Sequence, residues 1–378
     1  MFKFPWQNRQ PKAKNRKGDM VIELARGELE LDPSALPPGV QFKRCPKCRR
    51  IFDLKAIVCH VDSILLMLVQ ASDTDLENAI TAERADGTSF DVLCTRSVGN
   101  GSLCEVYEGL DTATKQRYAV KILLSQLVWD TKSARRFVQG AKTALLLQHK
   151  NIVGVHGIGS VVTKKEKKRP FVVCDYIEGK QLSELIAKDS LPVQVILDIF
   201  EQICVALEYA HFHGVVHGDL KPTNICIIEG DTNGKSSDSL ESIVVKVGDF
   251  AVAERLFREL EWDKVSTMTT SIYGCSTYLS PDFLDARLPT PVSDIYSVGC
   301  MMYECLTGSP PFTEGNDFAI MLAHRDTPPA PFSADYVPTQ VAQLVMKALE
   351  KDPRKRWQSA AELRDAIAQA KEGVNLLN

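Results

Sequence analysis

Between Phe90 and Ile177, short apolar runs separated by turn residues are typical of β-strands that bury one face. Four stretches carry this pattern: SFDVLCTRSVGNGSLCEVYEGLD, QRYAVKILL, NIVGVHGIGSVVT and RPFVVCDYI. One stretch between them, SARRFVQGAKTALLLQH, has helical character instead. The pattern therefore predicts a β-rich segment of about 90 residues that contains one helix.

From Pro192 onward, apolar residues recur at three- and four-residue spacing, which predicts amphipathic helices. The clearest examples are PVQVILDIFEQICVALEYAHFHG, SDIYSVGCMMYECLTG, PTQVAQLVMKALEKD and SAAELRDAIAQAK. A β-rich segment followed by a longer helical one predicts an α+β fold with two lobes. Ligands commonly bind between two such lobes.

The residues before Phe90 divide into three parts. Residues 1–40 contain Pro33 and Pro37-Pro38 and little periodicity, so we expect a disordered basic tail. Residues 41–70 form a small unit around a Cys-rich motif, and residues 71–89 are polar and acidic, which predicts a linker.

Composition narrows the class of protein further. A net charge of −3 over 378 residues argues against a nucleic-acid-binding surface that covers the whole protein. The eleven cysteines are scattered, and most lie in apolar runs, which favours buried thiols in the reducing cytoplasm. No apolar run reaches about 18 residues, so we expect no transmembrane helix. The basic N-terminus lacks the apolar core of a signal peptide.

Four motifs in chain order combine groups that suit phosphate chemistry. Gly99 and Gly101 allow close approach of backbone amides to phosphate, although a Gly-rich hairpin alone is equally typical of a simple turn. Lys121 lies in an apolar strand, where it needs a partner unless the strand edge is solvated. About twenty residues separate it from the glycines, which favours a phosphate partner.

The third motif is VVHGDLKPTNI, which contains Asp219, Lys221 and Asn224, and the fourth places Asp249 and Phe250 after an apolar strand. Mg²⁺ prefers one or two carboxylates together with phosphate oxygens and water, so Asp249 is a plausible ligand. Any one motif is weak by itself. All four in this order form a strong signal for phosphate transfer.

Together the motifs resemble the signature of the protein kinase family, and residues 90–370 look like a bacterial-type serine/threonine protein kinase domain. The resemblance implies an N-lobe over 90–178 and an α-helical C-lobe over 179–370. YGCSTYLSPDF at 273–283 resembles the end of an activation segment, and Asp294 resembles a buried anchor in the following helix. Arg356 is expected to pair with Asp282.

The resemblance also implies a role for each site residue. Gly99 and Gly101 would cover the phosphates of ATP, while Lys121 would contact the α- and β-phosphates. Asp219 would accept the proton of the substrate hydroxyl, and Lys221 would contact the γ-phosphate. Asn224 and Asp249 would hold Mg²⁺. The adenine pocket would be formed by Val98, Val106 and Ala119, by Cys174 at its back, and by the hinge residues Asp175, Tyr176 and Ile177.

Several positions depart from the family pattern. Gly140 lies where the helix of the N-lobe normally supplies a Glu to pair with Lys121. Gly218 replaces the Arg that in many kinases receives the activation-loop phosphate, which affects regulation rather than chemistry. Milder departures are Cys104 for the third loop glycine, Ala251 after Asp-Phe, and Cys275 for a Thr.

Two interpretations of the kinase-like domain follow. Every group expected to touch ATP, metal or hydroxyl is retained, so we favour an ATP- and Mg²⁺-dependent kinase acting on protein Ser/Thr. The alternative is a nucleotide-binding pseudokinase scaffold, since Lys121 lacks its Glu. Autophosphorylation would fall on Ser266, Thr267, Thr269, Thr270 or Ser271, which can equally be ordinary polar loop residues.

The cysteine motif resembles a small zinc-ribbon-like module found before some bacterial kinase domains. Cys45, Cys48 and Cys59 are candidate Zn²⁺ ligands, with His60 or Asp62 as the fourth. The alternative is a knuckle without metal, whose apolar pieces simply pack together. A third function class, binding of nucleic acid or a partner through residues 1–70, is the least favoured.

Overall fold

The computed structural model of this chain describes residues 41–44, 51–52, 67–70, 79–101, 103–128, 131–162, 168–188, 191–229, 243–250, 276–284, 289–333 and 337–375. The tail predicted over 1–40, the candidate zinc ligands and the Ser/Thr residues of 266–271 lie outside these ranges, as do Ala251 and Cys275. The chain forms two compact units, residues 1–76 with 161–168, and residues 77–160 with 169–378.

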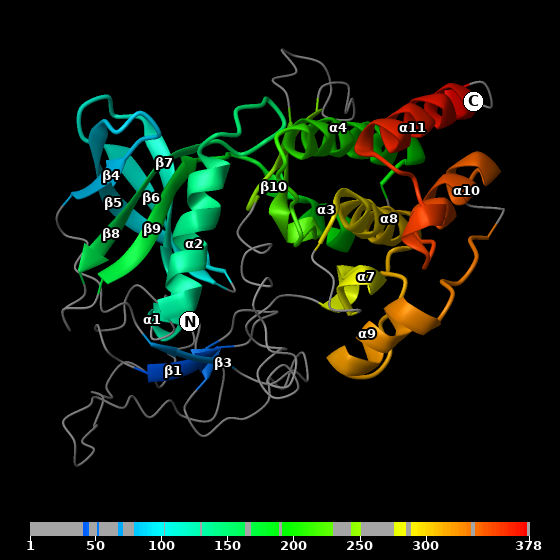
Figure 1. The fold of residues 1–378 in the computed structure, drawn as a ribbon, viewed down its shortest axis with the longest axis horizontal. Helices are drawn as coiled ribbons and strands as arrows, with labels where there is room; N and C mark the ends of the chain where they lie inside the picture. The colour runs from blue at the N-terminus through cyan, green and yellow to red at the C-terminus, as the bar shows by residue number, and fades with distance from the viewer. Residues whose placement is uncertain are drawn as a thin grey trace, which may run out of the picture. The chain divides into compact units, whose positions relative to one another are not determined.

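The first unit contains a small antiparallel sheet, drawn in blue in Figure 1. Its strands are β1 (Gln41–Arg44), β2 (Ile51–Phe52) and β3 (Met67–Gln70), in the order β2-β1-β3. Arg44 pairs with Ile51, so the Cys-x₂-Cys motif lies in the connection between two paired strands.

The second unit begins with a curved sheet in the order β4-β5-β6-β7-β9-β8. Its strands are β4 (Ile80–Glu83), β5 (Ser89–Asn100), β6 (Cys104–Asp111), β7 (Arg117–Leu123), β8 (Val155–Val162) and β9 (Lys168–Asp175). Tyr118, Val120 and Ile122 alternate along β7 and are buried, as expected for a strand with one face in the core.

The start of this sheet differs from the prediction, which placed residues 71–89 in a linker. Ile80–Glu83 form β4, which pairs antiparallel with β5. Ile80 and Ala82 are buried while the residues between and after them are exposed. The folded domain therefore begins before Phe90. A strand of four residues with two apolar side chains gives too weak a pattern to identify from sequence.

Two helices cover the sheet, α1 (Ser125–Val128) and α2 (Thr131–Ala144). Figure 1 shows α2 lying along the strands. Phe137 and Ala141, one helical turn apart, pack in a buried cluster with Leu123, Cys104 and Cys174. The predicted helix in this segment is confirmed.

The rest of the second unit is mainly helical, as predicted. Its helices are α3 (Leu182–Lys188), α4 (Val193–Phe212), α7 (Pro281–Leu284), α8 (Pro291–Thr307), α9 (Asp317–Asp326), α10 (Thr339–Ala348) and α11 (Ala360–Asn375). A small antiparallel sheet consists of β10 (Lys180–Gln181), β11 (Ile225–Glu229) and β12 (Ile243–Val247). The two-lobed α+β fold class predicted from the sequence is confirmed.

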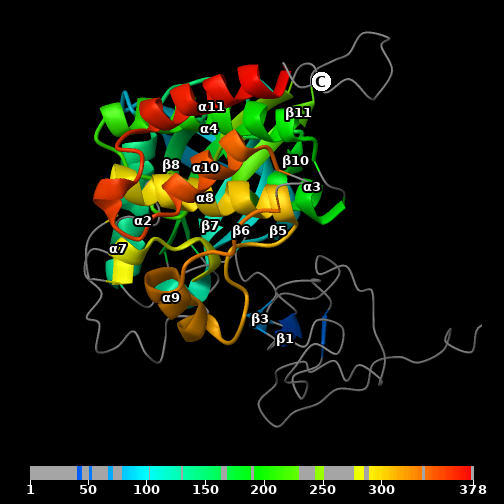
Figure 2. The ribbon, with the colours of Figure 1, turned by 90° about the vertical axis from the view of Figure 1, so that its right-hand side faces the viewer.

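Helix α8 forms the centre of the helical core and is buried along most of its length. Its first turn is closed by a capping box between Thr290 and Ser293, with Pro291 at the first helical position. It ends at Gly308, whose φ of 78° suits a residue without Cβ. Figure 2 shows α4 and α11 side by side over this core.

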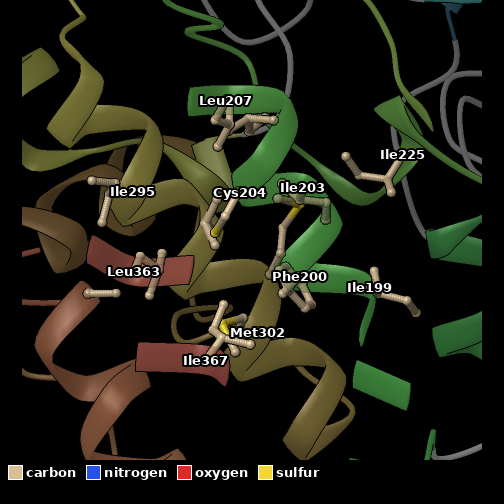
Figure 3. Close-up of a cluster of buried hydrophobic side chains, with 14 of the residues drawn as sticks. Ile199, Phe200, Ile203, Cys204, Leu207, Ile225, Ile295, Met302, Leu363 and Ile367 are labelled. Carbon is tan, nitrogen blue, oxygen red and sulfur yellow. The ribbon is translucent and has the colours of Figure 1, made fainter. Parts of the chain in front are cut away.

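Figure 3 shows apolar side chains of three helices meeting in this core. Ile203 and Leu207 come from α4, Ile295 from α8 and Leu363 from α11, and all are fully buried. This close packing makes the helical region a rigid support for the loops that leave it. In the part of the chain that is described, no helix is long and apolar enough to cross a membrane.

Candidate active site

The buried carboxylate of Asp294 on α8 accepts hydrogen bonds from the loop between α4 and β11. The backbone amides of His217 and Gly218 each donate to Asp294 at 2.9 Å, and Nε2 of His211 lies 2.8 Å from it. Burial favours the neutral carboxyl, but the His211 hydrogen bond keeps the pKa of Asp294 below its usual value. The buried anchor predicted at this position is confirmed.

Gly218 has a backbone requirement that the sequence did not reveal. Its φ is 74°, in the left-handed region that a residue with a Cβ rarely adopts. Glycine at this position therefore lets the loop turn so that both amides face Asp294. The glycine that replaces the Arg at position 218 therefore has a structural role of its own, because it allows this backbone turn.

Asp219 and Lys221 lie together at the end of this turn. Nζ of Lys221 is 2.5 Å from Oδ2 of Asp219, and the amide of Asp219 donates to Nδ1 of His217 at 3.2 Å. Burial raises the pKa of Asp219, and the nearby Lys221 ammonium partly offsets that rise. A carboxylate with a raised pKa is suited to accept a proton.

Asp249 and Lys121 form an ion pair across 128 residues of sequence. Lys121 comes from the middle of β7, and Asp249 follows β12 with a φ of 62°, a strained value for a non-glycine residue. Although burial favours the neutral carboxyl, the Lys121 ammonium holds the pKa of Asp249 below its usual value. The two aspartates are thus shifted in opposite directions, as expected for an acid–base site.

Asn224 and Asp249, the two residues predicted to hold Mg²⁺, are linked through the backbone of Gly248. The amide of Gly248, next to Asp249, donates to the carbonyl of Asn224 at 2.8 Å. The Asn224 side chain is buried, and its Nδ2 donates to the carbonyl of Asp219 at 2.8 Å. A carboxylate and an amide oxygen are both hard oxygen ligands of the kind that Mg²⁺ prefers. Among the described residues, no group of three or more His, Cys, Asp or Glu is placed to hold a metal.

The residues predicted for the nucleotide pocket lie on neighbouring strands of the curved sheet. Val106 on β6 is the cross-strand partner of Lys121, and Ala119 on β7 is the partner of Cys174. Val98 and Gly99 lie on β5, and Asp175 ends β9, followed by Tyr176 and Ile177.

The Gly-rich hairpin is closed by a hydrogen bond from the amide of Gly101 to the carbonyl of Cys104, at 2.8 Å. Val98 is 49% exposed, and no described hydrogen bond joins it to the Asp219 loop. The structure pairs Lys121 with Asp249 and Asp219 with Lys221.

Helix α2 offers no acidic residue to Lys121. Gly140 is buried between Phe137 and Ala141, on the helix face that packs against Cys104 and Cys174. Both thiols lie close enough to Lys121 to interact electrostatically with it. Among the described residues, Asp249 is the anion that pairs with Lys121.

The end of the activation segment is fixed by the pair predicted from sequence. Nη1 of Arg356 lies 2.7 Å from Oδ2 of Asp282, and both side chains are buried. Ser280 also donates to Asp282, at 2.6 Å. The expectation that Arg356 pairs with Asp282 is confirmed.

Sequence reasoning missed two groups that organise the site. Nδ1 of His217 accepts a hydrogen bond from the backbone amide of Asp219 at 3.2 Å, and its Nε2 lies 2.8 Å from the carbonyl oxygen of Gly248. Its position two residues before Asp219 is the signal from which it could have been identified. The carboxylate of Asp175, bound by His156 and Lys246, had no such signal because its partners are distant in sequence.

With this geometry in view, comparison with known proteins decides the family. The family model described as the protein kinase domain matches residues 93–367. The chain belongs to the protein kinase family. Its relatives include a serine/threonine-protein kinase PknB from Mycolicibacterium smegmatis, 33% identical over 280 residues, which cover 73% of this chain and 42% of the relative.

A second bacterial relative and a solved structure agree. A probable serine/threonine-protein kinase of Streptomyces coelicolor is 35% identical over 281 residues, which cover 73% of this kinase chain and 39% of the relative. The chain thus spans less than half the length of these curated relatives. The crystal structure of the Mycobacterium tuberculosis PknI kinase domain matches with a TM-score of 0.54 at 21% identity, covering 75% of this chain and 96% of that one, which supports the fold.

Proposed function

We propose that this chain transfers the γ-phosphoryl group of ATP to Ser or Thr hydroxyls of proteins, in a reaction that requires Mg²⁺. The observation that carries the proposal is that Asp219 and Asp249 each lie beside a lysine, Lys221 and Lys121, in a chain that belongs to the protein kinase family. This arrangement separates a group that accepts a proton from one that stays ionised beside phosphate and metal.

Each residue has a distinct part in the proposed reaction. Asp219 orients the substrate hydroxyl and accepts its proton, and Lys221 neutralises charge on the γ-phosphate. Lys121 contacts the α- and β-phosphates once it leaves Asp249. Asn224 and Asp249 hold Mg²⁺, which when bound neutralises negative charge on the phosphate oxygens.

The alternative of a pseudokinase scaffold finds no support in the comparisons. The relatives at 33% and 35% identity are named as kinases. In this chain Asp219, Asn224 and Asp249 are all present, and contacts with Lys221, Gly248 and Lys121 place them. The loss of a Glu at position 140 therefore affects how Lys121 is held, and it leaves the reacting groups in place.

The proposal is tested with purified chain, Mg²⁺ and γ-labelled ATP, with an unrelated Ser/Thr-rich protein as acceptor. We expect label on protein with the wild type and loss of label with Lys121→Met and with Asp249→Asn. Arg354→Met, a change at an exposed ion pair, is the control and should label normally. Equal label in all four proteins, or none in any while Mg-ADP still binds, would refute transfer by these residues.

Two finer proposals concern a covalent modification of the chain and a bound metal ion. We propose autophosphorylation within 266–271, which peptide mass spectrometry after incubation with Mg-ATP tests directly. A reaction confined to other segments contradicts it. Replacing all five hydroxyl residues there by Ala should abolish the modification without lowering label on an added acceptor.

We also propose that Cys45, Cys48 and Cys59 bind zinc, since the first two are separated by two residues and fall in the sequence between the paired strands β1 and β2. Metal analysis of protein purified without chelator should find zinc, and Cys48→Ser should lose it. Cys94→Ser, outside the motif, serves as the control. A folded chain that contains no zinc rejects this proposal.

A further inference from the structure

The carboxylate of Asp175, at the end of β9, is bound by groups from two other segments. Oδ2 accepts a hydrogen bond from the amide of Gly154 at 2.9 Å and lies 3.2 Å from Nζ of Lys246. Oδ1 lies 2.6 Å from Nε2 of His156. We call Asp175, His156 and Lys246 the Asp175 cluster.

Lys246 connects this cluster to strand β12, which leads to Asp249, the residue proposed to hold Mg²⁺. Lys246 lies on β12, three residues before Asp249, and its Nζ also donates to the carbonyl of Ile152 at 3.2 Å. Val247 exchanges backbone hydrogen bonds of 2.8 and 2.9 Å with residues 151–153. Residues 151–156 are therefore bound on one side to β12 and on the other to Asp175.

The contacts of Asp175 keep a charge in a partly buried place. Its side chain is 26% exposed, and burial alone favours the neutral acid. The hydrogen bonds from His156 and Gly154 and the charge of Lys246 outweigh that effect and lower the pKa of Asp175 to about 2. The carboxylate is therefore ionised over the whole physiological pH range.

Gly154 is shaped to admit this carboxylate. A Cβ at position 154 would lie 3.2 and 3.3 Å from the two carboxylate oxygens of Asp175, closer than ordinary packing allows. The backbone of Asp175 also donates to the carbonyl of Gly154 at 2.9 Å. Side chain and backbone of Asp175 are thus both fixed to the same glycine, which restricts the backbone that leads into the hinge.

We infer that the Asp175 cluster positions the nucleotide, by fixing the hinge backbone that receives the base relative to Asp249, which receives the metal and phosphates. The inference rests on the proposed function, because it assigns the hinge to adenine and Asp249 to Mg²⁺. The residues of the cluster are positioning residues, since their side chains act through the backbone and through β12. If the hinge backbone is no longer fixed relative to Asp249, part of the binding free energy is spent on ordering the two ends of the site, which lowers the affinity for the nucleotide.

The test measures Mg-ADP affinity, together with KM for ATP and kcat, in the full chain. Lys246→Met should raise both the Kd for Mg-ADP and the KM for ATP about five- to tenfold, with kcat changed less than about twofold. Lys246→Arg should restore most of the affinity, because a guanidinium can donate to the same carboxylate. If Lys246 had a purely structural role, Lys246→Met would lower the stability of the chain but would not raise KM selectively over a change in kcat.

A matched control exists in the helical core. Lys371 on α11 is 23% exposed, against 21% for Lys246, and it bridges Asp198 and Glu201 on α4. Lys371→Met should therefore cost similar stability and leave Mg-ADP affinity at the wild-type value. Gly154→Ala, which displaces the Asp175 carboxylate without removing a charge, should weaken Mg-ADP binding in the same direction as Lys246→Met.

The outcomes separate the inference from the proposed function. The inference is overturned if Lys246→Met and Gly154→Ala bind Mg-ADP with wild-type affinity. It is also overturned if they lose no more Mg-ADP affinity than Lys371→Met does. Neither result affects the proposed kinase activity. A rise in kcat/KM on breaking the cluster overturns the inference as well. A wild-type chain that binds no Mg-ADP refutes the proposed function, and the inference falls with it.

Discussion

Replacement of Arg356 by Met gives the largest loss of stability that we predict for this domain. Arg356 is 2% exposed and Asp282 is 5% exposed, so the change leaves a buried carboxylate without its cation. The guanidinium also donates to three backbone carbonyls, at 3.0 Å to Val292, 2.7 Å to Glu350 and 3.0 Å to Lys351.

The magnitude follows from what is left behind. Removing one partner of a buried ion pair costs about 3–5 kcal/mol in the free energy of unfolding. Ser280 and Ser293 still donate to Asp282, at 2.6 and 3.2 Å, which places the expected loss near the lower end of that range. For a domain of this size each kcal/mol lowers Tm by about 2–4 °C, so Tm should fall by about 6–12 °C.

Urea denaturation and calorimetry measure these values, and a nearby exposed pair provides the control. Arg354 lies two residues from Arg356, its side chain is 87% exposed, and it pairs with Asp352. Arg354→Met should leave stability unchanged within error. The double change Arg356→Met with Asp282→Asn should cost less than Arg356→Met alone, because no buried charge remains. Equal stability of Arg356→Met and Arg354→Met would refute this reasoning.

Three further predictions concern single positions. His324 is fully buried, and burial lowers its pKa to about 4. As the pH falls, the unfolded chain therefore takes up a proton on this histidine before the folded chain does, and the free energy of unfolding should fall by up to about 3 kcal/mol from pH 6.5 to pH 4. Urea titrations of His324→Gln should not show this loss. Gly218→Ala should destabilise by about 1 kcal/mol in urea because φ is 74°, and a stabilised variant would contradict that. Gly140→Glu should raise kcat/KM for ATP about tenfold by giving Lys121 a helix partner, and unchanged kinetics in the folded variant would show that Asp249 alone suffices.

The sequence was most informative where chemistry and spacing coincide within one motif. Asp219, Lys221 and Asn224 lie within six residues, and the structure keeps them together in one loop. The pairing of Arg356 with Asp282 was also predictable, because the resemblance covers both segments. Such groups need only local geometry or a family pattern to be identified.

Pairings between distant segments were harder to predict. The partners of the Asp175 carboxylate are 19, 21 and 71 residues away, and no periodicity connects them. Strand β4 was missed because its stability comes from pairing with β5, while its own four residues carry little signal. The position of Gly140 identified a missing partner for Lys121, but only the fold shows that Asp249 takes its place.

Gly218 shows how a substitution can be misread from sequence alone. As a missing Arg it suggests a lost regulatory contact. In the fold, its positive φ and its hydrogen bond to Asp294 show that it also shapes the loop that holds Asp219. Glycine permits a positive φ, but whether a given glycine adopts one depends on tertiary contacts that the sequence does not show.

The rate of phosphoryl transfer in a single turnover, compared between wild type and Asp219→Asn, tests the central claim most directly. A general base contributes about 10²–10⁴-fold, so the rate should fall by that factor in the variant while the Kd for Mg-ADP stays unchanged. Equal single-turnover rates in the two folded proteins would contradict the assignment of this chain as a kinase that acts through Asp219.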